Sequence, residues 1–461
     1  MPRFRVLPWL VAGALATLTT LASTRAHASP EDIFGYGPRS PAMGGTGTAH
    51  AEGFDAAYTN PALLSRLRAR KLTLGFQGAT FQLHADGPGL PGRLPYDPAK
   101  GIIIGIDLPI PFGGRLKDRV GVGMAFYTPT QILVRGRILY AEEPQYPLLP
   151  DRSQSLAARI GLGLDLGYGF RAGAGFAVLA EIAGDVIVAT DATGRVGSRV
   201  EDQLVATYAP IFGITHEGPI GKRGRDEKGN TIPGQHPDVL RVGAVFRGTL
   251  DARFSVAIDG TKLSSLNIPI FNISGVAQYD PMQAQVEAAL EHGPWTFAIG
   301  ATYKRWSAYP GLVEPTIRCP DDAPDCGALQ PKNPKLSDTL VPRAGVERKL
   351  DVTRGLGARL RAGYSLEPTP VPDVLPASEA YDRAAKETVP VANRFFDGTR
   401  HIFAVGGGIV LTDPLPPLSL DLYGQVHWLP ERTVDTGIGP DGVARISGTV
   451  LVVGMLAGVS F

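Results

Sequence analysis

Two cysteines and the acidic residues between them are the first candidates for chemistry in this chain of 461 residues. Cys319 and Cys326 enclose a short segment that carries Asp321, Asp322 and Asp325. In an oxidising compartment such closely spaced cysteines favour a disulfide, which would stabilise the fold by roughly 2–3 kcal/mol through loop closure. A metal site built on the aspartates is the alternative, but two cysteines without a nearby histidine are a poor zinc set. The sequence therefore predicts a disulfide and no metal.

Other residues with catalytic potential form no consistent site. Residues 437–442 fit the G-x-G-x-x-G pattern, but Pro440 stands where a helix would have to begin, so a loop is expected. Asp397 and His401 could act as an acid–base pair, or could end a solvated loop. The sequence has no G-x-S-x-G, H-E-x-x-H or P-loop pattern. We therefore expect no enzymatic activity and no cofactor.

The last residues of the chain alternate between two faces in the manner of a β-strand. The face opposite the apolar one carries mostly smaller residues. The apolar face consists of Leu451, Val453, Met455, Ala457, Val459 and Phe461. In a secreted bacterial chain this pattern is typical of the closing strand of an outer-membrane β-barrel.

The first 28 residues predict a secretory signal peptide. Two arginines precede an apolar stretch at 6–21, and Ala26-His27-Ala28 has the small-x-small form of a cleavage site. An N-terminal membrane anchor is the alternative, which the short apolar stretch, broken by Pro8, disfavours. Without the three arginines of this peptide, 42 of the 45 basic residues remain against 44 acidic ones. This balance gives no reason to expect a nucleic-acid partner.

Period-two alternation continues through most of the chain after residue 70 and predicts fourteen strands. The expected strands cover residues 70–83, 101–111, 119–139, 156–170, 174–190, 202–214, 238–258, 281–291, 294–307, 337–350, 354–367, 398–412, 416–429 and 444–461. Residues 238–258 hold one phase and are predicted to form a single long strand. The expected fold class is all-β, a 14-stranded antiparallel transmembrane β-barrel with an N-terminal plug. A soluble β-sandwich or β-propeller is the alternative.

The expected connections alternate between short turns and long loops. Short turns are expected at 171–173, 291–293, 351–353 and 413–415, and loops at 84–100, 140–155, 259–280, 308–336, 368–397 and 430–443. Bacterial barrels place short turns in the periplasm and long loops outside, so a bacterial outer-membrane location is predicted. Residues 215–237 are an exception, because a long segment stands where a short turn is due.

Residues 29–69 lack the alternation and contain many glycines and prolines, followed by a possible short helix at 55–67. A barrel interior can hold irregular backbone, so we expect this segment to plug the lumen as a hatch. A disordered periplasmic tail is the alternative. The predicted regions are therefore a signal peptide (1–28), a hatch (29–69) and a barrel (70–461). The residues expected to shape the hatch are Phe34, Tyr36, Gly44, Gly45, Asn60, Pro61 and Ala62.

A series of motifs carries a family resemblance. The N-terminal ones are Phe34-Gly35-Tyr36-Gly37, Ala42-Met43-Gly44-Gly45 and Asp55-Ala56-Ala57-Tyr58-Thr59-Asn60-Pro61-Ala62. Those downstream are Tyr303-Lys304-Arg305-Trp306-Ser307-Ala308-Tyr309, Arg361-Ala362-Gly363-Tyr364, 368–372 and 397–401. In this order they resemble the long-chain fatty acid transporter (FadL-type) family of outer-membrane proteins over nearly the whole mature chain. Leu63 departs from the family pattern, which usually has glycine there.

The resemblance implies a fourteen-stranded barrel, plugged by an N-terminal hatch, that passes hydrophobic molecules and opens sideways at a kinked third strand. In this chain the expected third strand carries Pro129. Proline removes a donor from the strand ladder, so Pro129 is a candidate for the kink and lateral opening. Alternatively, Pro129 simply ends the strand.

Charged residues are expected on the inward face, where cations could bind the carboxylate of a ligand. The candidate lumen cations are Arg159, Arg241, Arg247, Lys304, Arg359 and Arg361. We therefore expect a passive channel, gated by the hatch, for hydrophobic small molecules such as long-chain fatty acids. Its partners would be that substrate and outer-membrane lipid, and a monomer is expected. A general porin for polar solutes, or a surface receptor without transport, are the alternatives.

Overall fold

The computed structural model describes residues 30–130, 143–150, 152, 156–190, 196–221, 238–262, 271–311, 313–317, 333–382, 387–412 and 416–461. The expected signal peptide and both cysteines lie outside the described residues. Among the described helices, none is long and apolar enough to cross a membrane.

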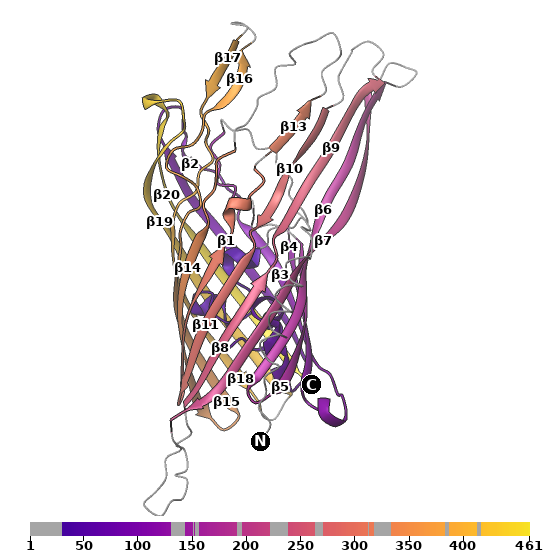
Figure 1. The fold of residues 1–461 in the computed structure, drawn as a ribbon, viewed down its shortest axis with the longest axis vertical. Helices are drawn as coiled ribbons and strands as arrows, with labels where there is room; N and C mark the ends of the chain where they lie inside the picture. Colours follow the sequence, from indigo (N-terminus) through magenta and orange to yellow (C-terminus); the bar gives the residue numbers. More distant parts are fainter. Residues whose placement is uncertain are drawn as a thin grey trace, which may run out of the picture.

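Fourteen antiparallel strands form a closed barrel (Figure 1). In order around the wall they are β1 (Lys71–Asp86), β3 (Ala99–Pro109), β4 (Val120–Pro129), β5 (Ala157–Gly167), β6 (Phe170–Thr190), β7 (Val196–Ile220), β8 (Asp238–Arg247), β11 (Gln283–His292), β12 (Trp295–Lys304), β14 (Thr339–Thr353), β15 (Leu356–Glu367), β18 (Arg400–Leu411), β19 (Leu418–Asp435) and β20 (Val443–Ser460). β20 closes the barrel on β1, with Lys71 opposite Ser460 and Asp86 opposite Arg445. The predicted fold class is confirmed.

The outward face of the barrel is apolar, as the closing strand illustrates. Leu451, Val453 and Met455 are 43–58% exposed, whereas Val450 and Val452, which alternate with them, are buried. Leu and Ile side chains on the other strands are exposed in the same alternating way. A closed barrel with an apolar outer surface satisfies its backbone hydrogen bonds in a bilayer, so the predicted outer-membrane location is confirmed.

The two ends of the barrel differ in their connections. Short turns join β11 to β12 and β14 to β15 at one end, which is the periplasmic end by the general rule. The expected turn at 171–173 is wrong: the turn lies at Tyr168 and Gly169, both with positive φ. Gly173 was mistaken for a turn glycine, but it lies within β6.

The opposite end carries additional strands and one-turn helices above the wall (Figure 1). They are β2 (Gly92–Leu94), β9 (Leu250–Lys262), β10 (Phe271–Asp280), β13 (Val313–Ile317), the hairpin β16 (Ser378–Asp382) and β17 (Glu387–Val391), η6 (Trp306–Ala308) and η7 (Pro440–Gly442). At the periplasmic end, η4 (Gly114–Leu116) lies between β3 and β4.

The prediction of one uninterrupted strand over 238–258 is wrong. Gly248 and Thr249 separate β8 from β9, and the Gly248 amide donates to the Pro210 carbonyl. The phase changes at this break, because Val242 and Phe246 point outward whereas Leu250 is 3% exposed. The count of fourteen wall strands survives, since β9 pairs with β10 and, in parallel, with the upper part of β6, and is not part of the closed series of wall strands. Of the exceptional segment 215–237, residues up to Ile220 extend β7 and 222–237 lie outside the described residues.

Residues 30–69, called here the N-terminal segment, lie inside the barrel. They form α2 (Pro30–Phe34), η1 (Pro41–Met43), η2 (Gly53–Asp55), α3 (Ala56–Thr59) and η3 (Pro61–Arg66). The single helix expected at 55–67 is wrong, because the extended conformation of Asn60 separates α3 from η3. η1 contacts β14, β15, β18 and β19, whereas η3 contacts β4, β5, β6 and β7. The segment therefore spans the lumen from one wall to the other.

Candidate functional site: the N-terminal segment in the barrel lumen

The inner wall is lined with glycines where the N-terminal segment meets it. This glycine belt consists of Gly105, Gly121, Gly123, Gly161, Gly163, Gly173, Gly213, Gly243, Gly345, Gly363 and Gly406. A Cβ on Gly163 would lie 2.5 Å from the Pro61 carbonyl oxygen, and one on Gly173 would lie 2.3 Å from the Ala62 nitrogen. Since real Cβ atoms essentially never come closer than 3.0 Å, only glycine lets the segment lie this close to the wall.

Asn60, Pro61 and Ala62 form the tightest part of this contact. Asn60 caps η3, because its side-chain oxygen accepts from the Ala62 amide at 3.1 Å. Its Nδ2 donates to the Thr48 carbonyl at 2.7 Å and so ties η3 to the preceding turn. Pro61 occupies the first helical position, where its missing N–H costs nothing. The triplet therefore fixes the geometry of η3 against the wall.

Gly44 and Gly45 end η1 in left-handed conformations, with φ of +66° and +76°. A Cβ on Gly44 would lie 2.6 Å from the Tyr364 nitrogen of β15. The Gly45 carbonyl accepts from Arg343 at 3.1 Å. Both glycines are thus required by the backbone conformation and by the closeness of the wall.

Phe34 and Tyr36 are almost completely buried. Phe34 lies 6.5 Å from Phe81 and 5.9 Å from His427, measured between ring centroids. Tyr36 makes an edge contact with Phe54 of η2 at 5.6 Å. The two rings therefore pack both within the segment and against the wall.

Carboxylates at the start of the segment pair with three buried cations. Glu31 contacts Arg159 at 3.2 Å, and Asp32 contacts Lys304 at 2.9 Å and Arg152 at 3.0 Å. Burial alone would raise the pKa of Asp32, but the charges of Lys304 and Arg152 outweigh it and hold that pKa well below its ordinary value. Asp32 is therefore ionised throughout the physiological range.

A second ionic network lies at the periplasmic side of the segment. Arg39 pairs with Glu52 at 3.1 Å and with Glu347 at 2.8 Å, and Glu52 also contacts Arg359 at 2.6 Å. Arg361 bridges Glu347 at 2.8 Å and Asp421 of β19 at 2.7 Å. The network joins the segment to three strands of the wall.

Glu287 of β11 binds the segment through its backbone. Its carboxylate accepts from the Gly47 amide at 2.8 Å and from the Ala49 amide at 2.9 Å, and it is 3% exposed. His50 lies beside it, and burial together with the charge of Arg39 lowers the pKa of His50 well below its ordinary value. His50 is therefore neutral at physiological pH.

The six predicted lumen cations do not gather at one place. Arg241 pairs with Glu217 and Glu291 at the periplasmic end, and Arg159, Lys304, Arg359 and Arg361 have the partners given above. Arg247 differs, because its contacts are with uncharged groups, including the Tyr58 and Thr59 carbonyls and Gln285. Arg159 and Arg247 share one cavity, where each lies against the Tyr58 ring, and Arg359 and Arg361 line another.

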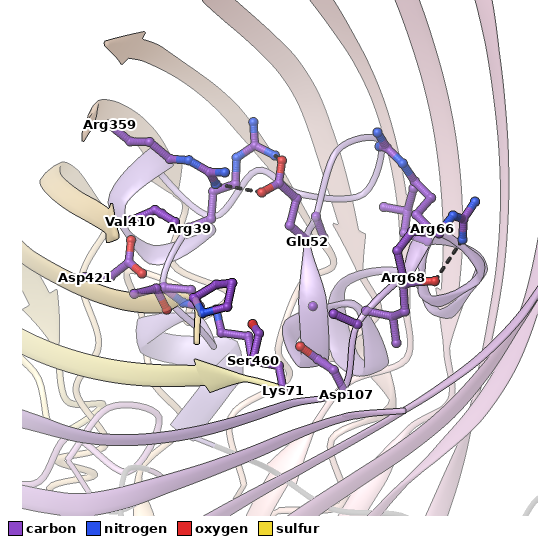
Figure 2. Close-up of a pocket in the computed structure, with 18 of the residues that line it drawn as sticks. Arg39, Glu52, Arg66, Arg68, Lys71, Asp107, Arg359, Val410, Asp421 and Ser460 are labelled. Atoms are coloured by element: carbon purple, nitrogen blue, oxygen red, sulfur yellow. Dashed lines mark hydrogen bonds and ion pairs between the residues drawn. The ribbon is translucent and has the colours of Figure 1, made fainter. Parts of the chain in front are cut away.

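Two of the cavities in the described part of the chain adjoin the N-terminal segment. The one between Arg159 and Arg247 has a volume of about 20 Å³, which is room for about one water molecule. The larger one, of about 390 Å³, lies on the periplasmic side of the segment (Figure 2). Among the described residues, no group of three or more His, Cys, Asp or Glu side chains could hold a metal ion.

On the extracellular side the barrel interior holds a cluster of buried rings, each at most 5% exposed, beside the ion pairs of Arg152 and Lys304. The members of the cluster are Phe34, at the start of the segment, and Phe81, Tyr146, Trp306, Phe395 and Phe396. These packed rings differ from the polar lumen of a water-filled porin.

Comparison with solved structures reveals the same architecture elsewhere. A FadL homologue from Pseudomonas aeruginosa aligns over 95% of this chain and 99% of its own, with a TM-score of 0.53 and 15% identity. The chain has the FadL-type fold. The toluene transporter TodX of Pseudomonas putida aligns over 95% of this chain and all of its own, with a TM-score of 0.50 and 13% identity. No family model and no curated protein matches the sequence.

In this FadL-type barrel Pro129 is the last residue of β4, and residues 131–142 after it lie outside the described part. Its predicted role as a kink therefore stays a prediction. The Asp397 carboxylate accepts from Thr369 at 2.6 Å, whereas His401 contacts the Tyr364 hydroxyl at 2.9 Å. Each thus has its own partner in the FadL-type fold, and no described hydrogen bond joins the two.

Sequence reasoning missed several residues that position the segment. Glu31, Asp32 and Glu52 gave no signal in the sequence, because their wall partners lie far away along the chain. The glycine belt did leave a signal, since glycines repeat at every second position opposite apolar side chains. Such pairs are Gly121 with Gly123, and Gly161 with Gly163.

Proposed function

We propose that this protein is an outer-membrane channel for the passive uptake of hydrophobic small molecules such as long-chain fatty acids. The observation that carries the proposal is the buried aromatic cluster on the extracellular side of the N-terminal segment. An apolar molecule gains free energy on leaving water for such a surface. A porin for polar solutes would need a polar, water-filled path.

The N-terminal segment would act as the hatch of this channel. It spans the lumen, and the 20 Å³ cavity above its Tyr58 leaves no room for a fatty acid. A ligand therefore requires a rearrangement of the hatch. A course consistent with this is capture by the outer loops, movement to the aromatic cluster, displacement of hatch contacts, and exit sideways near Pro129 or into the periplasm. The substrate's own gradient would drive the flow, and the barrel would work as a monomer.

Uptake measurements test the proposal. Cells that carry the protein should take up radiolabelled oleate or toluene faster than cells with an empty vector. Equal uptake of both compounds by the two strains would refute transport of these substrates. Removal of residues 29–62, with residues 1–28 kept for export, should turn a closed barrel into one that conducts ions in planar bilayers. High conductance by the intact protein would favour a general porin instead.

A further inference from the structure

The larger cavity lies on the periplasmic side of the hatch, away from the aromatic cluster. Its volume of about 390 Å³ lies within the ~300–1,000 Å³ range of small-molecule sites. The hatch lines it through Arg39, Glu52, Leu63 and residues 66–69, and the wall lines it through the ends of β1, β3, β15 and β18–β20. In Figure 2 the Arg39, Glu52 and Arg359 side chains lie on one side of this cavity and Arg66 and Arg68 on the other.

The charges that line the cavity are unequal. Six cationic side chains stand against three carboxylates. The cations are Arg39, Arg66, Arg68, Lys71, Arg359 and Arg361, and the carboxylates are Glu52, Asp107 and Asp421. Three of the cations are compensated, because Arg39 and Arg359 share Glu52, and Arg361 holds Asp421.

The other three cations are in excess. Within the described part of the chain, no carboxylate lies within 4.0 Å of Arg66, Arg68 or Lys71. Arg68 donates to the Ser65 and Leu67 carbonyls, both at 2.8 Å. Asp107 is the register partner of Lys71 between β3 and β1, so its single negative charge offsets part of the excess. Burial and the charge of Arg241 lower the pKa of Arg66, which indicates a site where an anion would be favourable.

Apolar side chains complete the lining. Leu63 and Leu67 of the hatch and Val410 and Leu418 of the wall face the same cavity as the excess cations. A simple inorganic anion would leave this apolar surface unused, whereas an alkyl carboxylate would use both parts. The cavity lies on the periplasmic side of the hatch, beyond the aromatic cluster in the proposed direction of uptake.

We propose that this cavity binds the carboxylate head and first methylenes of a hydrophobic acid as it leaves the hatch, with Arg66 as the cation that holds the carboxylate. The inference rests on the proposed function and deepens it, because it gives the acid group of the substrate a site on the periplasmic side of the hatch. Arg68 and Lys71 also line the cavity, Lys71 on the opposite side beside Ser460, and both add to its positive potential (Figure 2). Charge-assisted bonds to a partly desolvated carboxylate are stronger than ordinary hydrogen bonds.

Calorimetric titration of the full-length mature protein in nonionic detergent tests this site. The probes are octanoate, octanol and inorganic phosphate. Octanoate should bind at least tenfold more tightly than either octanol or phosphate. The substitution Arg66→Gln should weaken octanoate binding about tenfold, the effect of one partly buried charge-assisted contact. The matched control is Arg115→Gln, an exposed cation at the same end of the barrel, which should change the affinity less than twofold.

Three results would overturn the inference: equal affinities for octanoate and octanol, phosphate binding as tight as octanoate binding, or equal effects of Arg66→Gln and Arg115→Gln. If Arg66→Gln does not fold, titrations of the wild-type protein test the inference. Raising the NaCl concentration from about 50 to about 500 mM should weaken octanoate binding and leave octanol binding unchanged. Cellular uptake is a separate readout. Normal oleate uptake with no octanoate selectivity would refute this site alone, whereas octanoate selectivity without uptake would refute the transport function and leave an anion site.

Discussion

Replacing Gly173 by alanine should displace the hatch. A Cβ at this position would lie 2.3 Å from both the Ala62 nitrogen and the Pro61 carbonyl carbon, and 2.6 Å from the Pro61 oxygen. Ordinary contact begins at 3.4 Å, so η3 and β6 must separate by about 1.1 Å, the difference between 3.4 and 2.3 Å. All three atoms belong to the backbone and cannot turn aside as the end of a flexible side chain can.

The movement of η3 is also restricted by its contact with β4, which lies on the other side of β5 from β6. Leu64 of the same helix packs against Gly121 and Gly123 of β4, where a Cβ would lie 2.1 Å from its carbonyl oxygen and 2.4 Å from its Cδ2, respectively. Overpacking typically costs ~1–3 kcal/mol, and a backbone clash with little room to relax belongs at the upper end. About 3 kcal/mol shifts the ratio of seated to displaced hatch roughly a hundredfold.

Single-channel conductance in planar bilayers measures the displaced state, and limited proteolysis of the hatch measures it independently. Gly424→Ala is the matched control, because it is also a strand glycine but its nearest atom, the Val452 oxygen, would lie 3.7 Å from the new Cβ. Gly173→Ala should open more often and be cut faster than Gly424→Ala. If the two variants conduct and resist protease equally, the glycine belt does not hold the hatch at this distance.

The remaining predictions concern hatch contacts. Glu287→Ala removes the acceptor of two buried amides and should destabilise the hatch by roughly 3–5 kcal/mol, whereas Glu287→Gln should destabilise it less. Protease susceptibility of the hatch as a function of urea concentration measures this, and equal curves for the two variants would contradict it. Burial, and then the charge of Asp107, raise the pKa of Asp55 well above its ordinary value. The contribution of Asp55 to stability is therefore full below about pH 4 and is lost as pH rises through the raised pKa. The melting temperature of Asp55→Asn should consequently exceed that of the wild type by a margin that grows from pH 4 to pH 8. A margin that stays constant with pH would refute this. Asn60→Ala loses the cap of η3 and the bond to Thr48 and should cost about 1–2 kcal/mol in thermal unfolding, and an unchanged melting temperature would count against that role.

The barrel could be predicted from the sequence because its outer surface is apolar in strict alternation. Leu451, Val453 and Met455 face outward in β20 as their spacing requires. The same reasoning failed at 238–258, where Leu250 is apolar yet faces inward. Alternation of apolar residues does not reveal a break after which an apolar residue faces inward, and here Leu250, directly after the break at Gly248, is buried.

The site could be predicted only in part. The sequence singled out Asn60, Pro61 and Ala62 as a unit, and the structure places them together at the wall. It could not supply the partners of the cations, because Lys304 and Asp32 stand 272 positions apart and meet only when the barrel closes around the hatch. The sequence places Gly173 in a turn, because a glycine required for close packing cannot be distinguished in a sequence from one required for positive φ.

The two kinds of hatch contact have different physical consequences. A buried ion pair such as Arg159–Glu31 returns little net stability, since desolvation of both charges offsets their attraction, yet removal of one partner is costly. Such pairs therefore determine where each part of the hatch lies without adding much to its affinity for the wall. The glycine belt instead brings backbone and wall into dispersion contact over many atoms, which is collectively favourable. A substitution in the belt should consequently loosen the hatch as a whole, whereas loss of one ionic partner should misplace the part of the hatch that the pair holds.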